Sequence, residues 1–386
     1  MRIAIDARWI FPQISGIGAH TRELIRHLAL EDRENSYLLL FADRSLAERT
    51  WREADLADKP NFRPEIISSG VFSPRSQLTL PVRLARRRIE VFHSTNYMIP
   101  LASFPRERQG HIRCVVTIHD LIPLIFPSAT PRAIKTRLFP IYRRLMLEIG
   151  RRADRIIAVS EASRSDIIQH LEIPPERQGI ARVIYNGVSS TYRPLPEPSR
   201  PSLDPARARV ILYVGRSDPY KNLTNLVEAF ALARQQSPFP LTLRIIGPPD
   251  ARYPEPSQRV ATLGLGDSVV WVGYQSNTEL LRAYQEADAV VLPSRYEGFG
   301  FPVVEAMACG TPVVCSDIPV LREIAGDAAL WTHPDDVSGM ATQLLRAVTD
   351  PTLRSQLIAR GTIQARKFTW TEAARKTVAL YRELST

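Results

Sequence analysis

The chain has 386 residues, 44% of them hydrophobic and 23% charged, which is normal for a soluble globular protein and long enough for two domains. It has no apolar run of roughly 18 residues and no signal-peptide-like start, which argues against a transmembrane helix and secretion and favours a cytoplasmic protein. The net charge of +10 would suit a nucleic acid, an anionic membrane surface or a phosphorylated substrate, but no nucleic-acid recognition motif supports the first.

The first half of the chain shows strands that alternate with helices. A strand at 2–6 leads into a loop with Gly16 and Gly18, and then into a helix over 21–30 whose apolar residues share one face. Further short apolar runs predict strands at 37–41, 91–93, 114–118 and 155–159. Because these runs are continuous rather than alternating, they are typical of a parallel sheet covered on both faces.

The second half repeats this alternation. Five prolines between residues 193 and 209 exclude a helix or a central strand, so we predict a linker at 194–209 between domains 1–193 and 210–369. Strands are predicted at 210–214, 241–246, 269–272, 289–292 and 312–315, with helices over 223–233 and 279–286. The pattern indicates a second doubly wound domain. The final helix, within 370–386, can close this domain or cross back to the first, and the sequence leaves both open.

Candidate site residues follow the strands, because ligands of open α/β sheets bind beyond the carboxyl ends of the strands. Gly16 and Gly18 would let a backbone N–H approach an anion, although a flexible loop explains them equally well. The dinucleotide fingerprint is incomplete, since Thr21 stands where its third glycine would be. His119 directly follows the strand 114–118 and would face a cleft, with a structural histidine as the alternative.

Two cations lie where the strand 210–214 leads into a helix. Arg216 and Lys221 would face the positive end of the helix dipole, an arrangement that an anion such as a diphosphate would stabilise. Only five lysines occur among the 50 basic residues, so a lysine here indicates a place for a compact ammonium rather than a planar guanidinium. A solvated turn is the alternative interpretation.

A glycine-rich loop follows the strand 289–292. Gly298 and Gly300 predict a tight turn, and Pro302 suits the first turn of a helix. Glu297 lies on the loop and Glu305 on the helix, where apolar neighbours leave the carboxylate in need of a polar partner. A pair of sugar or ribose hydroxyls would be a suitable partner.

In this order, the segments resemble the family-four retaining glycosyltransferases of the GT-B fold over nearly the whole chain. The most specific element is the Glu-x7-Glu pattern of Glu297 and Glu305, and Asn186-Gly187-Val188 matches the family's Asn-Gly-Val. Asp6-Ala7-Arg8 and the segment 118–123 look most like bacterial mannosyltransferases of O-antigen and exopolysaccharide assembly. The resemblance implies an α/β GT-B fold with two Rossmann-like doubly wound domains that face each other across a cleft, the acceptor side in the first and the donor side in the second.

The resemblance also implies a role for each matching residue. Arg216 and Lys221 match the family's basic pair and would stabilise the leaving diphosphate, while Glu305 would accept hydrogen bonds from the ribose. Gly16, with Gly18 beside it, would contact the phosphate of the nucleotide sugar. The sugar itself would be contacted by Glu297, His119 and the backbone of Phe299, Gly300 and Phe301. Gly273 and Tyr274 would lie near the base.

The chemistry implied is transfer of a hexose from a nucleotide sugar to a glycan or lipid-linked glycan in cell-surface polysaccharide synthesis. No Asp-x-Asp motif occurs, so we expect neither a metal nor another cofactor, the fixed cations acting on the leaving group instead. GDP-mannose is the leading donor by resemblance, and UDP- and dTDP-sugars remain open. The competing functions are a sugar-nucleotide epimerase, a phosphorylase and a non-catalytic sugar-nucleotide-binding module.

Arginines in the first domain leave open a peripheral attachment to the inner face of the plasma membrane. The stretch 133–150 combines apolar and basic residues, and a basic amphipathic helix can lie on an anionic surface. An ordinary domain helix with a solvated face is the alternative. The arginines concerned are Arg86, Arg87, Arg88, Arg143, Arg144, Arg151, Arg152 and Arg155.

Overall fold

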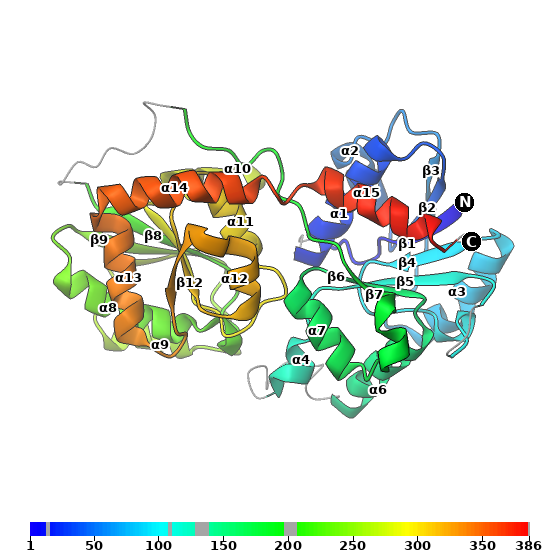
Figure 1. Cartoon of the computed structure of the whole chain (residues 1–386), viewed down its shortest axis with the longest axis horizontal. Coiled ribbons are helices and arrows are strands. Elements are labelled where there is room, and N and C mark those ends of the chain that lie inside the picture. The colour runs from blue at the N-terminus through cyan, green and yellow to red at the C-terminus, as the bar shows by residue number, and fades with distance from the viewer. Residues whose placement is uncertain (13–15, 107–109, 128–138, 197–206, 385–386) are drawn as a thin grey trace. The chain divides into compact units, whose positions relative to one another are not determined.

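The computed structural model describes residues 1–12, 16–106, 110–127, 139–196 and 207–384, which form two compact units (Figure 1). Unit 1 comprises the described residues of Met1–Leu124, Leu138–Gly187 and Thr369–Thr386, and unit 2 those of Ile125–Arg137 and Val188–Phe368. The chain therefore passes from unit 1 to unit 2 after Leu124 and again after Gly187, and it returns to unit 1 at Leu138 and at Thr369. None of the helices in the described ranges has the length and apolarity needed to cross a membrane.

Unit 1 is built on a seven-stranded parallel sheet with the order β3-β2-β1-β4-β5-β6-β7. The strand order reverses between β1 and β4, which places the crevice typical of ligand binding beyond the carboxyl ends of these two strands. The strands are β1 Arg2–Asp6, β2 Ser36–Phe41, β3 Phe62–Ile66, β4 Val91–Ser94, β5 Arg113–Ile118, β6 Arg155–Ala158 and β7 Ala181–Val183. The helices are α1 Gly16–Glu31, α2 Arg44–Glu53, α3 Pro74–Arg86, α4 Ile122–Ile125, α6 Phe139–Arg152, α7 Glu161–His170 and α15 Trp370–Arg382.

Unit 2 contains a six-stranded parallel sheet with the order β10-β9-β8-β11-β12-β13, which reverses between β8 and β11. Two doubly wound α/β domains, as predicted from the alternation of strands and helices, are thus confirmed. The strands are β8 Arg209–Val214, β9 Leu241–Ile246, β10 Val269–Val272, β11 Ala289–Leu292, β12 Val313–Ser316 and β13 Ala329–Thr332. The helices are α8 Leu223–Gln236, α9 Glu255–Thr262, α10 Asn277–Glu286, α11 Phe301–Ala308, α12 Pro319–Ala325, α13 Val337–Thr349 and α14 Pro351–Ala365.

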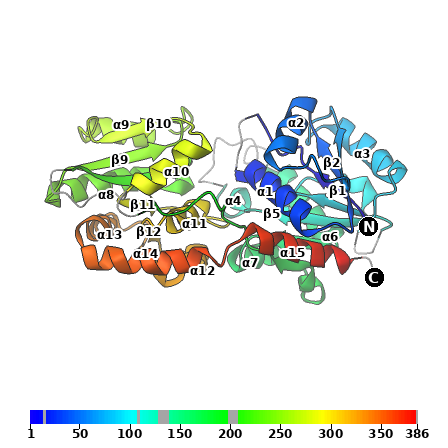
Figure 2. The same ribbon diagram turned by 90° about the horizontal axis from the view of Figure 1, so that it is seen from above.

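The core of unit 2 shows why the helical spacing in the sequence was informative. Leu226, Val227 and Phe230 of α8 recur at helical spacing and are fully buried against the sheet and α13. Helix α13 packs on α8, whereas α14 packs on α11, so the sheet is covered on both faces (Figure 2). This double cover is what the continuous apolar runs of the strands require.

The last helix belongs to unit 1, a question that the sequence left open. Helix α15 lies beside α1 (Figure 1), and Arg375 and Arg382 form ion pairs of 2.7 and 2.8 Å with Glu31 and Glu34. Its Tyr381 hydroxyl lies 2.6 Å from Nδ1 of His93 on β4. Buried apolar and polar contacts together therefore attach this helix to the sheet of unit 1.

Two sequence expectations about local structure need correction. Gly16 and Gly18 lie in the first turn of α1 rather than in a loop before it, and residues 13–15 lie outside the described residues. Strands β3, β7 and β13 were not predicted; all three are edge strands, although the edge strand β10 was predicted. Strand β3, for example, is mostly accessible and contains Pro64, so it lacks the buried apolar run of a central strand. Of the predicted linker, residues 197–206 lie outside the described residues.

Candidate functional site

The loops after β8 and β11 meet at the point in unit 2 where the strand order reverses. Asn222 ends the loop after β8 in the left-handed conformation, with φ of +61°. Its side-chain Nδ2 donates to the carbonyl oxygens of Pro293 and Pro334 at 3.1 and 2.6 Å. Asn222 therefore ties the loop that carries Lys221 to the loop that carries Glu297.

Lys221 and Glu297 form an ion pair at this junction. The distance from Lys221 Nζ to Glu297 Oε1 is 2.7 Å, and the side chains are only 15% and 10% exposed. The Ser294 hydroxyl donates to the same carboxylate oxygen at 2.7 Å, which leaves Oε2 as the oxygen without a contact from these two residues. The sequence assigned Lys221 and Glu297 separate roles, whereas the structure makes each the partner of the other.

Arg216 is the more accessible of the two predicted cations. Its Nε lies 2.8 Å from Oδ2 of the buried Asp218, and its backbone carbonyl accepts a hydrogen bond of 2.6 Å from the Tyr213 hydroxyl. The guanidinium is thus anchored at one edge while most of the side chain reaches solvent. Both Arg216 and Lys221 have carboxylate partners within the protein, which compensate part of their charge near the start of α8. That a diphosphate binds to these cations stays a prediction.

The glycine-rich loop ends at the N-terminus of α11. Gly300 is the N-cap residue and has φ of +98°, and a Cβ there would lie 2.8 Å from Leu321 Cδ2, so both conformation and space favour glycine. Pro302 lies in the first turn, as predicted. Phe299 is buried and packs on Phe301, with ring centroids 5.3 Å apart, which leaves its backbone as the part available to a ligand.

Glu305 lies in the second turn of α11, and two tyrosine hydroxyls form hydrogen bonds with its carboxylate. The Tyr284 hydroxyl donates to Glu305 Oε2 at 2.7 Å, and the Tyr192 hydroxyl also hydrogen-bonds to the carboxylate. Burial raises the pKa of Glu305 to about 7, although both tyrosine hydrogen bonds act to lower it. The polar partner that the sequence required for this carboxylate is therefore supplied, at least in part, by the protein itself.

The segment after β10 offers a different surface. A Cβ at Gly273 would meet no atom within 4 Å, and the side chain of Tyr274 is 68% exposed. An accessible backbone beside an accessible aromatic ring suits stacking with a planar ligand. Both residues lie in unit 2 with Arg216, Lys221, Glu297 and Glu305.

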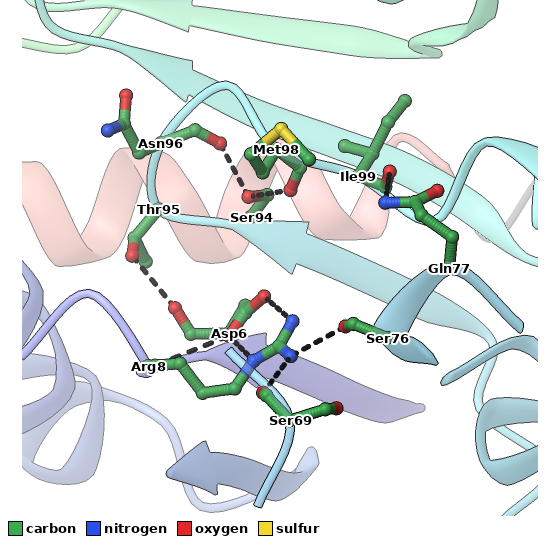
Figure 3. A network of polar contacts seen from close by, with 10 residues as sticks. All are labelled: Asp6, Arg8, Ser69, Ser76, Gln77, Ser94, Thr95, Asn96, Met98 and Ile99. Atoms are coloured by element: carbon green, nitrogen blue, oxygen red, sulfur yellow. Dashed lines mark hydrogen bonds and ion pairs between the residues drawn. The ribbon is translucent and has the colours of Figure 1, made fainter. Parts of the chain in front are cut away.

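In unit 1, the segment Asp6-Ala7-Arg8 forms a buried network at the end of β1 (Figure 3). Arg8 contacts both carboxylate oxygens of Asp6, at 2.8 and 2.6 Å, and donates to Ser76 Oγ at 2.7 Å. The Thr95 hydroxyl donates to the Asp6 carbonyl at 2.9 Å, which connects the segments after β1 and β4. This motif is a structural support of the loops after β1 and β4, because both of its charges are buried and paired.

His119 is half-buried at the end of β5. Its Nε2 donates to the Thr95 carbonyl at 3.0 Å, so the other ring nitrogen, Nδ1, is the hydrogen-bond acceptor of the neutral ring. Burial is the main cause that lowers the pKa of His119. Gly16, which opens α1, is exposed, and Gly18 is buried. The prediction that Gly16 and His119 reach a donor bound in unit 2 stays a prediction.

Sequence reasoning missed the residues that support this site. Tyr192 and Tyr284 hold Glu305, Ser294 holds Glu297, and Asn222 joins two loops. Their spacing along the chain gives no indication of these contacts, which join residues up to 113 positions apart in the sequence. The position of Tyr192 shortly after Asn-Gly-Val was the one available hint.

Buried histidines in unit 1 predict acid sensitivity. Burial lowers the pKa of His93 to about 3 and that of His20 well below its ordinary value near 6.5. Unfolded chains take up these two protons as the pH falls below about 6.5, whereas the folded protein does not, so the free energy of unfolding should fall by up to about 3 kcal/mol per pH unit there. Urea unfolding at pH 7, 6 and 5 measures this slope.

The matched variants are His20→Phe and, as a control, His333→Gln, since His333 is exposed. In His20→Phe, the change in the free energy of unfolding per pH unit below pH 6.5 should be smaller by about 1.4 kcal/mol, which corresponds to one proton. In His333→Gln, this change should be the same as in the wild type. Equal slopes in both variants would contradict the assignment.

Comparisons with known proteins cover the whole chain. Residues 14–192 match the family described as Glycosyltransferase Family 4, and residues 197–364 match Glycosyl transferases group 1. The O-antigen chain mannosyltransferase B of Escherichia coli is 29% identical over 406 residues, with all of both chains covered.

Solved structures agree with the observed architecture. Sucrose-phosphate synthase from Thermosynechococcus elongatus has a TM-score of 0.75 at 23% identity, with 99% of this chain and 98% of that one covered. HepE from Anabaena, solved in complex with UDP-glucose, has a TM-score of 0.73 at 20% identity, with 99% and 100% covered. At such identities these likenesses concern the fold.

Proposed function

Because the chain belongs to the family-four glycosyltransferases of the GT-B fold, we propose that it transfers a hexose from a nucleotide sugar with retention of configuration at the anomeric carbon. The observation that carries the proposal is the Lys221–Glu297 pair, with Arg216 nearby in the sequence and the N-terminus of α11 at the end of the same loop. Mannose from GDP-mannose is the proposed donor group, and a glycan or lipid-linked glycan of a cell-surface polysaccharide is the proposed acceptor, because a relative that aligns over the full length of both chains is an O-antigen chain mannosyltransferase.

The cations would act on the leaving diphosphate. An ammonium carries three N–H donors, so Lys221 can hold Glu297 and a phosphate oxygen at once. The accessible guanidinium of Arg216 would bind a second phosphate oxygen. Because negative charge on the diphosphate increases as the glycosidic bond breaks, these contacts strengthen in the transition state and raise the rate. In the retaining reaction proposed, the departing phosphate takes the proton of the acceptor hydroxyl, which attacks from the same face.

Glu297 would contribute on the sugar side. Lys221 and Ser294 both contact Oε1, so Oε2 is the oxygen that we assign to a hydroxyl of the donor sugar. The fixed negative charge would also stabilise the positive charge that develops on the sugar ring. We propose Glu305 for the ribose hydroxyls, and the surface of Gly273 and Tyr274 for the base.

The experiment that tests this function begins with thermal unfolding in the presence of GDP, UDP and dTDP sugars. A nucleotide sugar at 100 times its Kd should stabilise the protein by about 2.7 kcal/mol, and GDP-mannose is expected to do so.

Transfer of the sugar to an acceptor glycan should then proceed in EDTA, since the fixed cations are proposed to act in place of a metal. Release of free nucleotide without an acceptor would instead indicate an epimerase, and a requirement for phosphate and an α-glucan would indicate a phosphorylase. Loss of activity in EDTA, with rescue by magnesium, would overturn the metal-independent mechanism.

We also propose that unit 1 attaches peripherally to anionic membranes, through α3 rather than through the stretch 133–150. Residues 133–138 lie outside the described residues, and the apolar Tyr142, Met146 and Ile149 of α6 are buried in unit 1. Ile141 of α6 is 66% exposed, but it is a single large exposed hydrophobic residue, whereas on α3 Leu78 and Val82 are 75% and 50% exposed on one stripe of the helix. The exposed arginines around them are Arg75, Arg83, Arg86, Arg87 and Arg88.

Co-sedimentation with phosphatidylglycerol vesicles tests this proposal. Replacement of Leu78 and Val82 by serine should lower binding more than tenfold, because each aliphatic side chain contributes about 1.5 kcal/mol or more when it leaves water. Ile363→Ser is the matched control, since Ile363 is an exposed apolar residue on α14 of unit 2. Binding that is insensitive to salt, or equally lowered by the control, would contradict the assignment to α3.

A further inference from the structure

Two histidine rings from different elements meet beside the end of β5 in unit 1. His20 of α1 is only 5% exposed, and the centroid of its ring lies 4.5 Å from that of His119, with the planes nearly perpendicular. The Trp370 ring packs on His20 from α15, with centroids 5.4 Å apart. His119 therefore has a buried aromatic neighbour whose own position is fixed by packing.

The orientation of His20 is set by a hydrogen bond. Its Nδ1 lies 2.7 Å from Oδ1 of Asn186, and since an amide oxygen only accepts, Nδ1 carries the proton. Burial, with the neighbouring His119 as a second cause, lowers the pKa of His20 well below its ordinary value, so the ring is neutral. Its Nε2 is buried and has no hydrogen-bond partner among the described residues, which means that a single polar contact fixes the ring.

The same helix also supports His119 by a second route. His119 Nε2 donates to the Thr95 carbonyl, and the Thr95 hydroxyl lies 2.9 Å from that of Thr21, the residue after His20. One turn of α1 thus contacts the His119 ring directly through His20. Through Thr21 it also contacts Thr95, the residue whose carbonyl accepts the hydrogen bond from His119. Displacement of His20 would remove this aromatic contact, whereas the hydrogen bond from His119 Nε2 to Thr95 would remain.

His20 further touches two of the segments at which the chain passes between the units. Asn186 precedes Gly187, the last residue of unit 1 before the chain leaves it, and Trp370 follows Thr369, where the chain returns. The two segments are in close backbone contact, since a Cβ at Gly187 would lie only 2.1 Å from Trp370 N. Both neighbours that fix His20 therefore come from one tightly packed junction.

We propose that His20 is a positioning residue for His119, held in a single tautomer by Asn186 and packed in place by Trp370. The inference rests on the proposed function and on the role that the family resemblance implies for His119, which is contact with the donor sugar. We assign this contact to Nδ1, the hydrogen-bond acceptor of the neutral ring. A fixed His119 ring keeps this acceptor in one place, and misplacement of a contact to the reacting sugar lowers the rate more than it weakens nucleotide binding. The side chains proposed for the diphosphate, the ribose and the base, which are those of Arg216, Lys221, Glu305 and Tyr274, lie in unit 2, whereas His20 lies in unit 1.

The test compares His20→Phe with His27→Phe in the full-length protein. Phenylalanine keeps an aromatic ring of similar size at position 20 but cannot donate to Asn186. His27 is the matched control, because it lies on the same helix and its ring is 6.5 Å from that of Trp370. We expect His20→Phe to lower kcat by roughly 10- to 100-fold with little change in the Kd of the nucleoside diphosphate, and His27→Phe to leave both nearly unchanged.

Nitrogen-15 NMR of the histidine side chains gives a readout that a purely structural role would not move. His119 should give one set of ring signals, from the Nε2-protonated tautomer, in the wild type, and broadened or multiple sets in His20→Phe, because the ring can then move about its hydrogen bond to Thr95. Asn186→Ala should reproduce the altered His119 signals, and Asn186→Asp, which keeps an acceptor for His20, should restore one set. An unchanged His119 signal in both His20→Phe and Asn186→Ala would overturn the proposal. The NMR measurement needs no substrate, so failure of the proposed transferase activity would remain distinguishable from failure of this inference.

Discussion

Replacing Lys221 by alanine should lower kcat by about 10²- to 10³-fold, and replacing Glu297 in the same chain should not add a second loss of that size. The loss of one preorganised charge at a developing anion costs roughly 3–4 kcal/mol of transition-state stabilisation. Because Lys221 Nζ and Glu297 Oε1 are 2.7 Å apart, either single variant also changes the position and the charge environment of the other residue. Such contacting residues show coupling energies of about 0.5–3 kcal/mol.

The measurement is a double-mutant cycle of Lys221→Ala and Glu297→Ala, followed both by steady-state kinetics and by thermal unfolding. The surface pair of Lys376 and Glu372 is the matched control, since its atoms are 3.6 Å apart and both side chains are about half exposed. Its coupling should not exceed about 0.5 kcal/mol, as is usual for exposed pairs on one helix. Near-normal turnover of Lys221→Ala would show that the ammonium does not act on the diphosphate.

The second large effect is expected at Glu305, where Glu305→Gln should stabilise the fold at pH 8 and weaken nucleotide binding. The folded pKa of about 7 lies above the ordinary value of 4.5, so the folded protein keeps a proton that the unfolded chain releases between these values. The contribution of this group to stability is therefore complete below about pH 4.5 and is lost as the pH rises through 7. A neutral glutamine avoids this loss and should gain about 1–3 kcal/mol at pH 8, but almost nothing at pH 4.5.

The same substitution should weaken binding of the free nucleoside diphosphate, because an ionised carboxylate accepts hydrogen bonds from hydroxyls more strongly than an amide does. Since these contacts exist in both the ground and the transition state, KM should rise with little change in kcat. Glu297→Ala should show the opposite split, with kcat lowered by roughly 10²-fold or more. Calorimetric titration and kinetics of both variants measure the contrast.

Tyr192→Phe is the control for the stability effect. It removes a hydroxyl that lowers the pKa of Glu305, so it should destabilise the fold at pH 8 where Glu305→Gln stabilises it. If Glu305→Gln raises the unfolding temperature without affecting nucleotide affinity, the carboxylate does not bind the ribose. If Glu297→Ala abolishes nucleotide binding and Glu305→Gln leaves it intact, the two roles are reversed.

The sequence by itself determined the central architecture. Continuous apolar runs predicted the buried central strands, because a strand covered on both faces has no polar side to interrupt it. Gly300 and Pro302 predicted the start of α11, because the local backbone conformation there depends on residues next to each other in the chain. The edge strand β3 escaped prediction, since an accessible strand tolerates charged residues and proline and so lacks that pattern.

Only the tertiary structure decided how the candidate residues act on one another. Lys221 and Glu297 are 76 positions apart, and their pairing follows from the adjacency of β8 and β11 in the sheet, which no local pattern encodes. The partners of Glu305 and the attachment of α15 to unit 1 arise in the same way. The spacing of apolar residues along a chain indicates the period of a helix or a strand. The partner of a buried charge depends instead on which strands are neighbours in the sheet. The sequence could therefore nominate the charged residues of the site, but their neutralisation, and with it their pKa values, became visible only in the folded chain.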